Sequence, residues 1–342
     1  MAEPQDASSP VPHTSVRARP PELLAGQDHG DLDHQLTPTR AWALILPAYL
    51  CFSLLDASAK WLVLAGFAPL FVVWCRYLGH VLFILIYLRS WEHRDTLRTV
   101  HPWLQIIRGA LLATGTLCNF LALQYLQLAE TMAIFLASPM LITALSGPLL
   151  GEWAGWRRWL AVVVGFAGVL VVVRPGTDAF QFGMVYSLVA LVATALYFIM
   201  TRRMTETESD ESMIVYGGLA PAVVLLPALF VQGSWPGLTV ELGLLCALGV
   251  FGAVGHLFVI KAHRIAPAPS IAPAVFTQVI WMTALGWLVF DQLPDRWTVA
   301  GIAIIVASGL YILNRERLLA HEADNDSLDG APASAVADAG RE

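Results

Sequence analysis

Three charged residues lie within stretches that are otherwise apolar enough to cross a membrane. Asp56 and Lys60 occur in LLDASAKWLV, and Arg76 occurs in FVVWCRYLGH. A charge in the hydrocarbon core costs roughly 2.5–3.5 kcal/mol on insertion scales, so such a group usually faces a bundle interior or a wet cavity and pairs with a partner. These residues are therefore the first candidates for binding a charged ligand or for moving a proton.

Asp56 and Arg76 are predicted to lie at the same depth. Counted at 1.5 Å per residue from one end of each predicted span, they lie about 12 and 13 Å inside the membrane. Their two helices are adjacent and antiparallel, so we expect a carboxylate and a guanidinium to face each other. Two interpretations stay open: a structural ion pair, or a site for a substrate anion with a proton-coupled carboxylate.

Other polar residues within the apolar stretches are weaker candidates for ligand binding or proton transfer. Lys60 lies one turn beyond Asp56 and is expected at the rim, where its stem could extend to the interface or add positive potential. Glu130 begins a predicted span, so it could cap that helix or line a vestibule. His256 could relay protons or join two helices. Asn119 and Gln278 could orient a ligand or hold helices together.

Aromatic residues within the predicted spans could stack on a flat aromatic substrate, or could simply pack. The candidates are Trp74, Tyr77, Phe120, Tyr197 and Trp281.

The composition requires a membrane to position these side chains. The 342 residues are 57% apolar and only 13% charged, whereas a soluble domain carries about 25% charged residues. The four cysteines lack CxxC spacing, so neither a disulfide framework nor a zinc site is indicated. We expect no cofactor and no metal. The polar ends of the chain, residues 1–40 and 318–342, are predicted to be disordered.

About 20 apolar residues cross a bilayer, and this length divides the chain into ten spans, all of them α-helical. The predicted spans are 41–64, 67–88, 104–124, 131–150, 157–173, 180–200, 213–232, 238–260, 269–290 and 297–314. Fourteen Lys and Arg residues fall on one side of these spans, and two, Arg174 and Arg296, on the other. Because cytoplasmic loops carry the excess of basic residues, both termini are expected in the cytoplasm.

The two halves of the chain resemble each other. Residues 128–152 align without gaps on residues 267–291, and the aligned segments end in the acids Glu152 and Asp291. Five spans per half is an odd number, so the second copy must be inverted in the membrane. Pro139 and Pro273 are predicted to interrupt corresponding spans, either as tolerated kinks or as part of a site at the repeat interface.

These features resemble the EamA-type branch of the drug/metabolite transporter superfamily. The resemblance covers residues 41–317 and rests on two five-span repeats, an acid at each loop (GE and FD), glycine-spaced final helices, and the motifs D-A-x-x-K-W-L and W-x-R-Y. Asp291 departs from the glutamate common there, and Ala161 from the glycine. The resemblance implies two repeats, 41–173 and 180–314, in a bacterial inner membrane.

The resemblance also implies a secondary transporter of a small metabolite that works by alternating access. An importer of the riboflavin or S-adenosylmethionine type is one expectation, and an exporter of amino acids or other metabolites is the alternative. No Walker A sequence is present, so a gradient of protons, another ion or substrate is expected to supply the energy. An integral-membrane enzyme is disfavoured because no acids, histidines or metal ligands cluster in the loops. Expected partners are the small-molecule substrate, the lipid bilayer and, in one arrangement, a second copy of the chain, but no nucleic acid.

Overall fold

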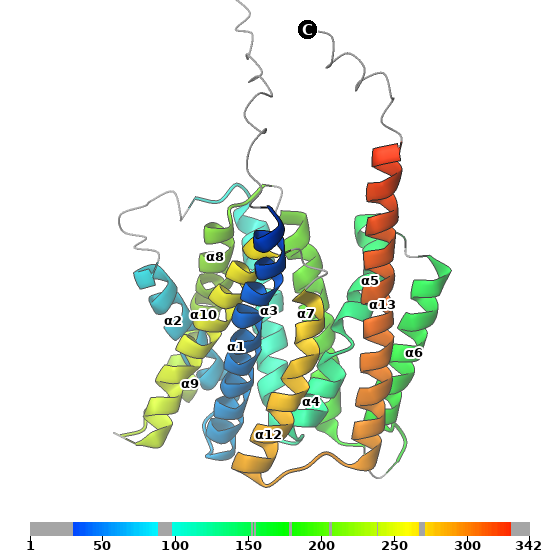
Figure 1. The fold of residues 1–342 in the computed structure, drawn as a ribbon. Helices are drawn as coiled ribbons and strands as arrows, with labels where there is room; N and C mark the ends of the chain where they lie inside the picture. The colour runs from blue at the N-terminus through cyan, green and yellow to red at the C-terminus, as the bar shows by residue number, and fades with distance from the viewer. Residues whose placement is uncertain are drawn as a thin grey trace, which may run out of the picture.

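Every regular element of the described chain is a helix, and the helices stand side by side as a bundle (Figure 1). The structure is a computed structural model that describes residues 30–87, 98–151, 153, 155–177, 180–204, 207–237, 239–266 and 271–329. Ten helical segments within these ranges are long and apolar enough to cross a membrane, which confirms the ten predicted spans. Helices suit this composition because they satisfy every backbone hydrogen bond within one segment.

The two halves of the chain contribute five spans each. The first half comprises α1 (Gly30–Leu64), α2 (Pro69–Tyr87), α3 (Pro102–Leu123), α4 (Leu128–Phe135), α5 (Ser138–Leu150) and α6 (Trp156–Val173). The second half comprises α7 (Phe182–Met204), α8 (Asp210–Val224), α9 (Leu226–Gln232), α10 (Val240–Ile265), the 3₁₀ helix η2 (Ala272–Thr277), α12 (Gln278–Phe290) and α13 (Arg296–Asp329).

Helices extend from the first and last spans into the parts of both predicted tails that the structure describes. Helix α1 begins at Gly30, inside the expected tail of residues 1–40. Helix α13 continues to Asp329, well past the predicted start of the second tail at residue 318. Polar residues can extend a helix beyond the apolar segment because propagation from an existing helix needs no new nucleus. Both extensions lie at one end of the bundle, at the top of Figure 1, which we call the terminal end.

Two spans in corresponding positions are interrupted beside their prolines, as predicted. The fourth span divides into α4 and α5, with Pro139 in the first turn of α5. The ninth span begins as the 3₁₀ helix η2, with Pro273 in its first turn, and continues as α12. Proline lacks a backbone donor and disfavours helical geometry in the preceding residue, which accounts for both interruptions.

The helix contacts follow an inverted-repeat pattern. Helix α1 packs on α10 as α7 packs on α3, and α2 packs on α10 as α8 packs on α3. The α2–α10 crossing brings Gly79 and Gly249 together so closely that a Cβ on Gly79 would lie 3.0 Å from the Gly249 Cα. The α3–α8 crossing matches it with Gly109 against Ala220. Small residues allow these close crossings, which bring side chains of both halves to the bundle interior.

The final helices of the two repeats, α6 and α13, pack against each other through their glycines. A Cβ on Gly168 would lie 3.1 Å from the carbonyl oxygen of Gly301. Helix α5 ends at Gly151 and α12 ends at Asp291, and both residues adopt the left-handed conformation. Counted from these helix ends, Asp291 corresponds to Gly151, one residue before the aligned Glu152, which lies outside the described residues.

Candidate substrate-binding site

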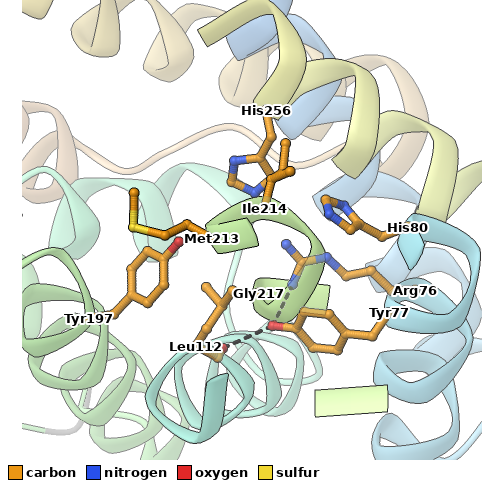
Figure 2. A pocket seen from close by; sticks show the side chains of 9 residues that line it. All are labelled: Arg76, Tyr77, His80, Leu112, Tyr197, Met213, Ile214, Gly217 and His256. Carbon is orange, nitrogen blue, oxygen red and sulfur yellow. Dashed lines mark hydrogen bonds between the residues drawn. The ribbon is translucent and has the colours of Figure 1, made fainter. Parts of the chain in front are cut away.

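A small cavity lies between the two halves, at the level where α2, α3, α7, α8 and α10 meet (Figure 2). Its volume is about 40 Å³. Its lining residues are Arg76, Tyr77, His80, Leu112, Tyr197, Met213, Ile214, Gly217 and His256. Four of these were predicted site residues, and none of the nine is acidic. The cavity therefore combines a guanidinium with four rings that carry polar atoms.

Arg76 reaches the cavity from α2 with most of its hydrogen-bond donors unused. Its Nη1 donates to the hydroxyl of Thr116 on α3 and, at 3.4 Å, to that of Tyr77. The guanidinium carbon also lies 4.9 Å from the centre of the Tyr77 ring. Its Nε and Nη2 have no hydrogen-bond partner within the part of the chain that the structure describes. Figure 2 shows the guanidinium pointing into the cavity, where these donors can meet an acceptor.

Asp56 is not in direct contact with Arg76, so the expected ion pair is wrong in detail. The Asp56 carboxylate instead accepts a hydrogen bond of 3.0 Å from Asn119 Nδ2. Asn119 and Thr116 lie three residues apart on α3, so this helix holds the two charges at successive turns. The two charges still interact electrostatically. Asn119, whose role the sequence left open, thus positions the Asp56 carboxylate.

Two histidines lie beside Arg76. The rings of His80 on α2 and His256 on α10 meet edge to face, with their centres 5.8 Å apart. His256 also contacts the ring of Phe52 on α1, at 5.0 Å between centres. His256 therefore joins helices through its ring contacts. Its ring also lines the cavity, so a role in proton transfer stays a prediction.

Arg108 is a second intramembrane arginine and lies on the terminal-end side of the cavity. Its side chain is only 1% exposed. Its guanidinium donates to Gln105 Oε1 at 2.8 and 3.2 Å, to the Tyr197 hydroxyl at 3.3 Å, and to the carbonyl oxygen of Met213. Because Tyr197 and Met213 also line the cavity, Arg108 fixes the wall that separates the cavity from the terminal end.

Lys60 is buried and does not extend to the membrane interface, so its expected place at the rim is wrong. The side chain is 2% exposed, and Nζ donates to the carbonyl oxygen of Leu126 at 2.5 Å. Leu126 follows the last turn of α3, where carbonyl groups lack helical partners. Nζ also lies 5.3 Å from the centre of the Phe290 ring. Lys60 therefore ties α1 to the end of α3.

Glu130 caps a helix, in agreement with the first of its two interpretations. Its carboxylate accepts a hydrogen bond of 2.8 Å from the Gln127 backbone N–H as part of a capping box at the start of α4. At the same end of the bundle, Arg174 and Asp295 form an ion pair of 2.7 Å between the end of α6 and the start of α13. The ion pair joins the two repeats at the end opposite the termini.

Glu208 closes the terminal end of the bundle between the repeats. Its Oε1 accepts hydrogen bonds from the backbone N–H groups of Val100 and His101, at 2.9 and 2.7 Å, and from the Thr99 hydroxyl at 2.8 Å. The acceptor lies at the N-terminus of α3, where unpaired N–H groups favour an anion. Burial opposes ionisation of Glu208, but these hydrogen bonds outweigh it and hold its pKa below the ordinary value.

The remaining predicted residues lie away from the cavity lining. Trp74 donates from Nε1 to the Ala222 carbonyl oxygen at 3.1 Å and packs against Phe71. Phe120 is 1% exposed within the main apolar core. Gln278 begins α12 at its junction with η2. Trp281 follows one turn later, and its buried Nε1 has no hydrogen-bond partner among the residues that the structure describes.

Sequence reasoning missed three polar residues that complete this region. His80 lies four residues after Arg76, a spacing that places both on one helix face. Thr116 has the same relation, at three residues, to Asn119. Arg108, which lies six residues inside α3, was left without a role because it is close to the start of the predicted span. Helical spacing from the predicted residues would have found the first two.

The chain is similar in sequence to known transporters. The model of the EamA-like transporter family matches residues 39–174 and 181–314, one match for each repeat. An S-adenosylmethionine uptake transporter of Rickettsia prowazekii (strain Madrid E) is 29% identical over 224 residues, which cover 66% of this chain and 76% of that protein. A riboflavin transporter of Vibrio cholerae serotype O1 is 28% identical, over 82% of this chain and 94% of that protein.

Two further matches widen the comparison. The pseudopaline exporter of Pseudomonas aeruginosa (strain UCBPP-PA14) is 24% identical over 66% of this chain and 80% of that protein. One crystal structure superposes with a TM-score of 0.55 at 19% identity, over 80% of this chain and 98% of that chain, which supports the fold alone. Because the family model covers both repeats, the chain belongs to the EamA-like transporter family of the drug/metabolite transporter superfamily.

Proposed function

We propose that this protein is a secondary active transporter that moves a small metabolite across a bacterial inner membrane by alternating access. The observation that carries the proposal is the position of Arg76. Its guanidinium keeps free donors in a cavity lined by α2 and α3 of the first repeat and by α7, α8 and α10 of the second. Substrate sites of inverted-repeat transporters lie at this interface, near the middle of the membrane.

The size of the cavity supports a cycle of opening and closing. A volume of about 40 Å³ holds only about three water molecules, whereas ligand pockets measure about 300–1,000 Å³. A metabolite must therefore enter a wider conformation. The Glu208 contacts at the terminal end and the Arg174–Asp295 pair at the other end join the repeats, so opening on either side has to release one of these sets.

The proposed orientation places both termini in the cytoplasm. It rests on fourteen basic residues on the terminal side of the spans and two, Arg174 and Arg296, on the other. In this orientation Glu208 closes the cytoplasmic side, and Arg174 and Asp295 close the outer side.

Relatives of the chain support both directions of transport. The uptake transporters for S-adenosylmethionine and riboflavin favour import, and the pseudopaline exporter favours the alternative. The same cavity serves either direction, because each half-cycle exposes one site to one side. We propose that a gradient of protons or of another ion drives the cycle.

The experiment is counterflow into proteoliposomes that contain the full-length protein. Liposomes preloaded with unlabelled S-adenosylmethionine, riboflavin, an amino-acid mixture or organic anions are diluted into the matching labelled compound, with and without an imposed pH gradient. We expect accumulation above protein-free liposomes for at least one class, and its loss in Arg76→Ala. If no class accumulates in liposomes that contain correctly folded protein, the proposal is wrong.

A further inference from the structure

We infer that Arg76 and Asp56 together bind the α-amino-acid group of a zwitterionic substrate, with its carboxylate on Arg76 and its ammonium group on Asp56. This inference rests on the proposed transport function and names the class of substrate. It uses the difference between the expected ion pair and the observed arrangement: the two opposite charges interact electrostatically, but each is held by neutral side chains rather than by the other.

The carboxylate half of the site is the guanidinium of Arg76. Its Nε and Nη2 have no partner within the described residues, and Figure 2 shows the group directed into the cavity between Tyr77 and His80. A planar guanidinium with two adjacent donors matches a carboxylate. The cavity lining contains no acid that would neutralise Arg76. The cavity therefore favours an anionic group over a neutral or cationic one.

The ammonium half of the site is the carboxylate of Asp56. One of its oxygens, Oδ1, accepts the Asn119 amide hydrogen, and the other has no hydrogen-bond partner within the described residues. An ammonium group supplies three donors, and binding to a carboxylate satisfies both charges. Asn119 thus orients Asp56 and leaves an acceptor free for a substrate.

The spacing of the two halves suits a compact zwitterion. Thr116 and Asn119, which hold the two charged groups, lie three residues apart on α3, a rise of about 4.5 Å along the helix. An α-amino acid carries both charges on one carbon and therefore suits charged groups held on neighbouring turns of one helix. A substrate with only one charge would leave the other protein charge buried without a partner, which is costly. The arrangement thus selects molecules that carry both groups.

This inference distinguishes the substrates named for the relatives. S-adenosylmethionine contains an α-amino-acid group, whereas riboflavin has neither a carboxylate nor an ammonium group. The arrangement in this chain therefore favours an amino-acid-bearing metabolite over a flavin.

The test is a ligand-and-variant cycle on the full-length protein in nanodiscs. The probes are S-adenosylmethionine, S-adenosylhomocysteine, methionine, phenylalanine and arginine, each compared with its decarboxylated and its deaminated derivative. Binding is measured by ligand-induced thermal stabilisation over a range of concentrations. The proteins are wild type, Arg76→Ala, Asp56→Asn and the control Arg174→Gln, which removes a cation at the far end of the bundle.

We expect at least one zwitterion to bind wild type, and loss of either charged group to weaken its binding about 10- to 100-fold. In Arg76→Ala, removing the carboxylate should have almost no further effect, while removing the ammonium group still weakens binding. Asp56→Asn should show the reverse pattern. Arg174→Gln should discriminate as wild type does. A merely structural role for either residue would not produce this crossed pattern.

Three results would overturn the inference. The first is that no zwitterion in the panel binds wild type. The second is that the truncated derivatives bind as tightly as their parents. The third is that Asp56→Asn changes only the response to a pH gradient, which would make Asp56 a coupling group. Counterflow of riboflavin without binding of any zwitterion would overturn this inference while supporting the proposed transport function. Absence of all counterflow would instead remove the transport function.

Discussion

The two intramembrane arginines occupy opposite sides of one cavity and differ in what they bind. Arg108 is 1% exposed and donates to Gln105, Tyr197 and the Met213 carbonyl. Arg76 is only partly buried and contacts the hydroxyls of Thr116 and Tyr77, while its Nε and Nη2 have no hydrogen-bond partner among the described residues. A cation whose three nitrogens all donate hydrogen bonds to the protein stabilises the fold, whereas one that keeps donors free can receive a ligand. Arg108 therefore belongs to the structural framework of the bundle, and Arg76 belongs to the candidate site.

The largest expected effect on stability comes from removing the buried guanidinium of Arg108. Arg108→Ala leaves Gln105 Oε1, the Tyr197 hydroxyl and the Met213 carbonyl without their donor, and each unsatisfied buried group costs about 1–3 kcal/mol. We expect a loss of at least about 2 kcal/mol of stability, read as a large fall in Tm in detergent or as failure to accumulate in the membrane. An Arg108→Ala variant as stable as wild type would contradict the structural role.

Removing the guanidinium of Arg76 should have the opposite effect, with a large loss of transport and a small loss of stability. In Arg76→Ala the protein should insert normally, with a smaller fall in Tm than Arg108→Ala, because the losses are the contacts to Thr116 and Tyr77 and the longer-range interaction with Asp56. Counterflow should fall at least about 100-fold, as expected for removal of a charge-assisted bidentate contact. The measurement is counterflow rate and Tm on the same preparation. Normal transport kinetics would refute the role of Arg76.

The orientation of Arg76 can be tested without removing its charge. Thr116→Val keeps the size of the side chain but removes the hydroxyl that accepts from Arg76 Nη1. We expect the apparent KM to rise about 10- to 100-fold with little change in maximal rate, because a hydrogen bond to a charged group contributes about 1.5–3 kcal/mol. Thr131→Val, which removes a hydroxyl bonded only within its own helix, serves as the matched control.

The smallest expected effect on stability is that of a substitution at Glu208, at the terminal end of the bundle. The pKa of Glu208 is held below its ordinary value of 4.5 by the hydrogen bonds at the start of α3, so its contribution is present above pH 4.5 and is lost as the pH falls through the lowered value. Glu208→Gln should reduce stability by about 1 kcal/mol at pH 7 and by progressively less as the pH falls below 4.5. The difference in Tm between the two proteins, followed from pH 7 to pH 3, checks this sign. A difference that grew on acidification would contradict it.

The fold was largely predictable from the sequence, and the detailed contacts were not. The span count follows from apolar length, and the interruptions at Pro139 and Pro273 follow from the missing donor of proline. Depth along a helix is a matter of counting residues, so Asp56 and Arg76 could be assigned to similar levels. Which side chain each one contacts depends on helix rotation and on the neighbours that α3 presents. The sequence alone does not fix those.

Lys60 and Arg108 are buried inside the bundle, although each lies near the end of a predicted span. Lys60 was expected at the rim because its long stem can extend to the interface, but the open carbonyl at the end of α3 lies within reach and binds it. Arg108 was left without a role because it lies only about one turn inside the third predicted span, but it is buried where α3 packs against α7 and α8. Distance from the membrane surface is therefore a poor guide to burial inside a bundle.

The most direct test of the central claim is ligand-induced stabilisation of wild type and Arg76→Ala by the zwitterion that shows the strongest counterflow. A ligand that binds only the folded state raises Tm in proportion to its occupancy, so saturation at 100 times Kd contributes about 2.7 kcal/mol. We predict a rise of several degrees for wild type and a rise at most about half as large for Arg76→Ala at the same ligand concentration. Equal stabilisation of both proteins by that ligand would contradict it.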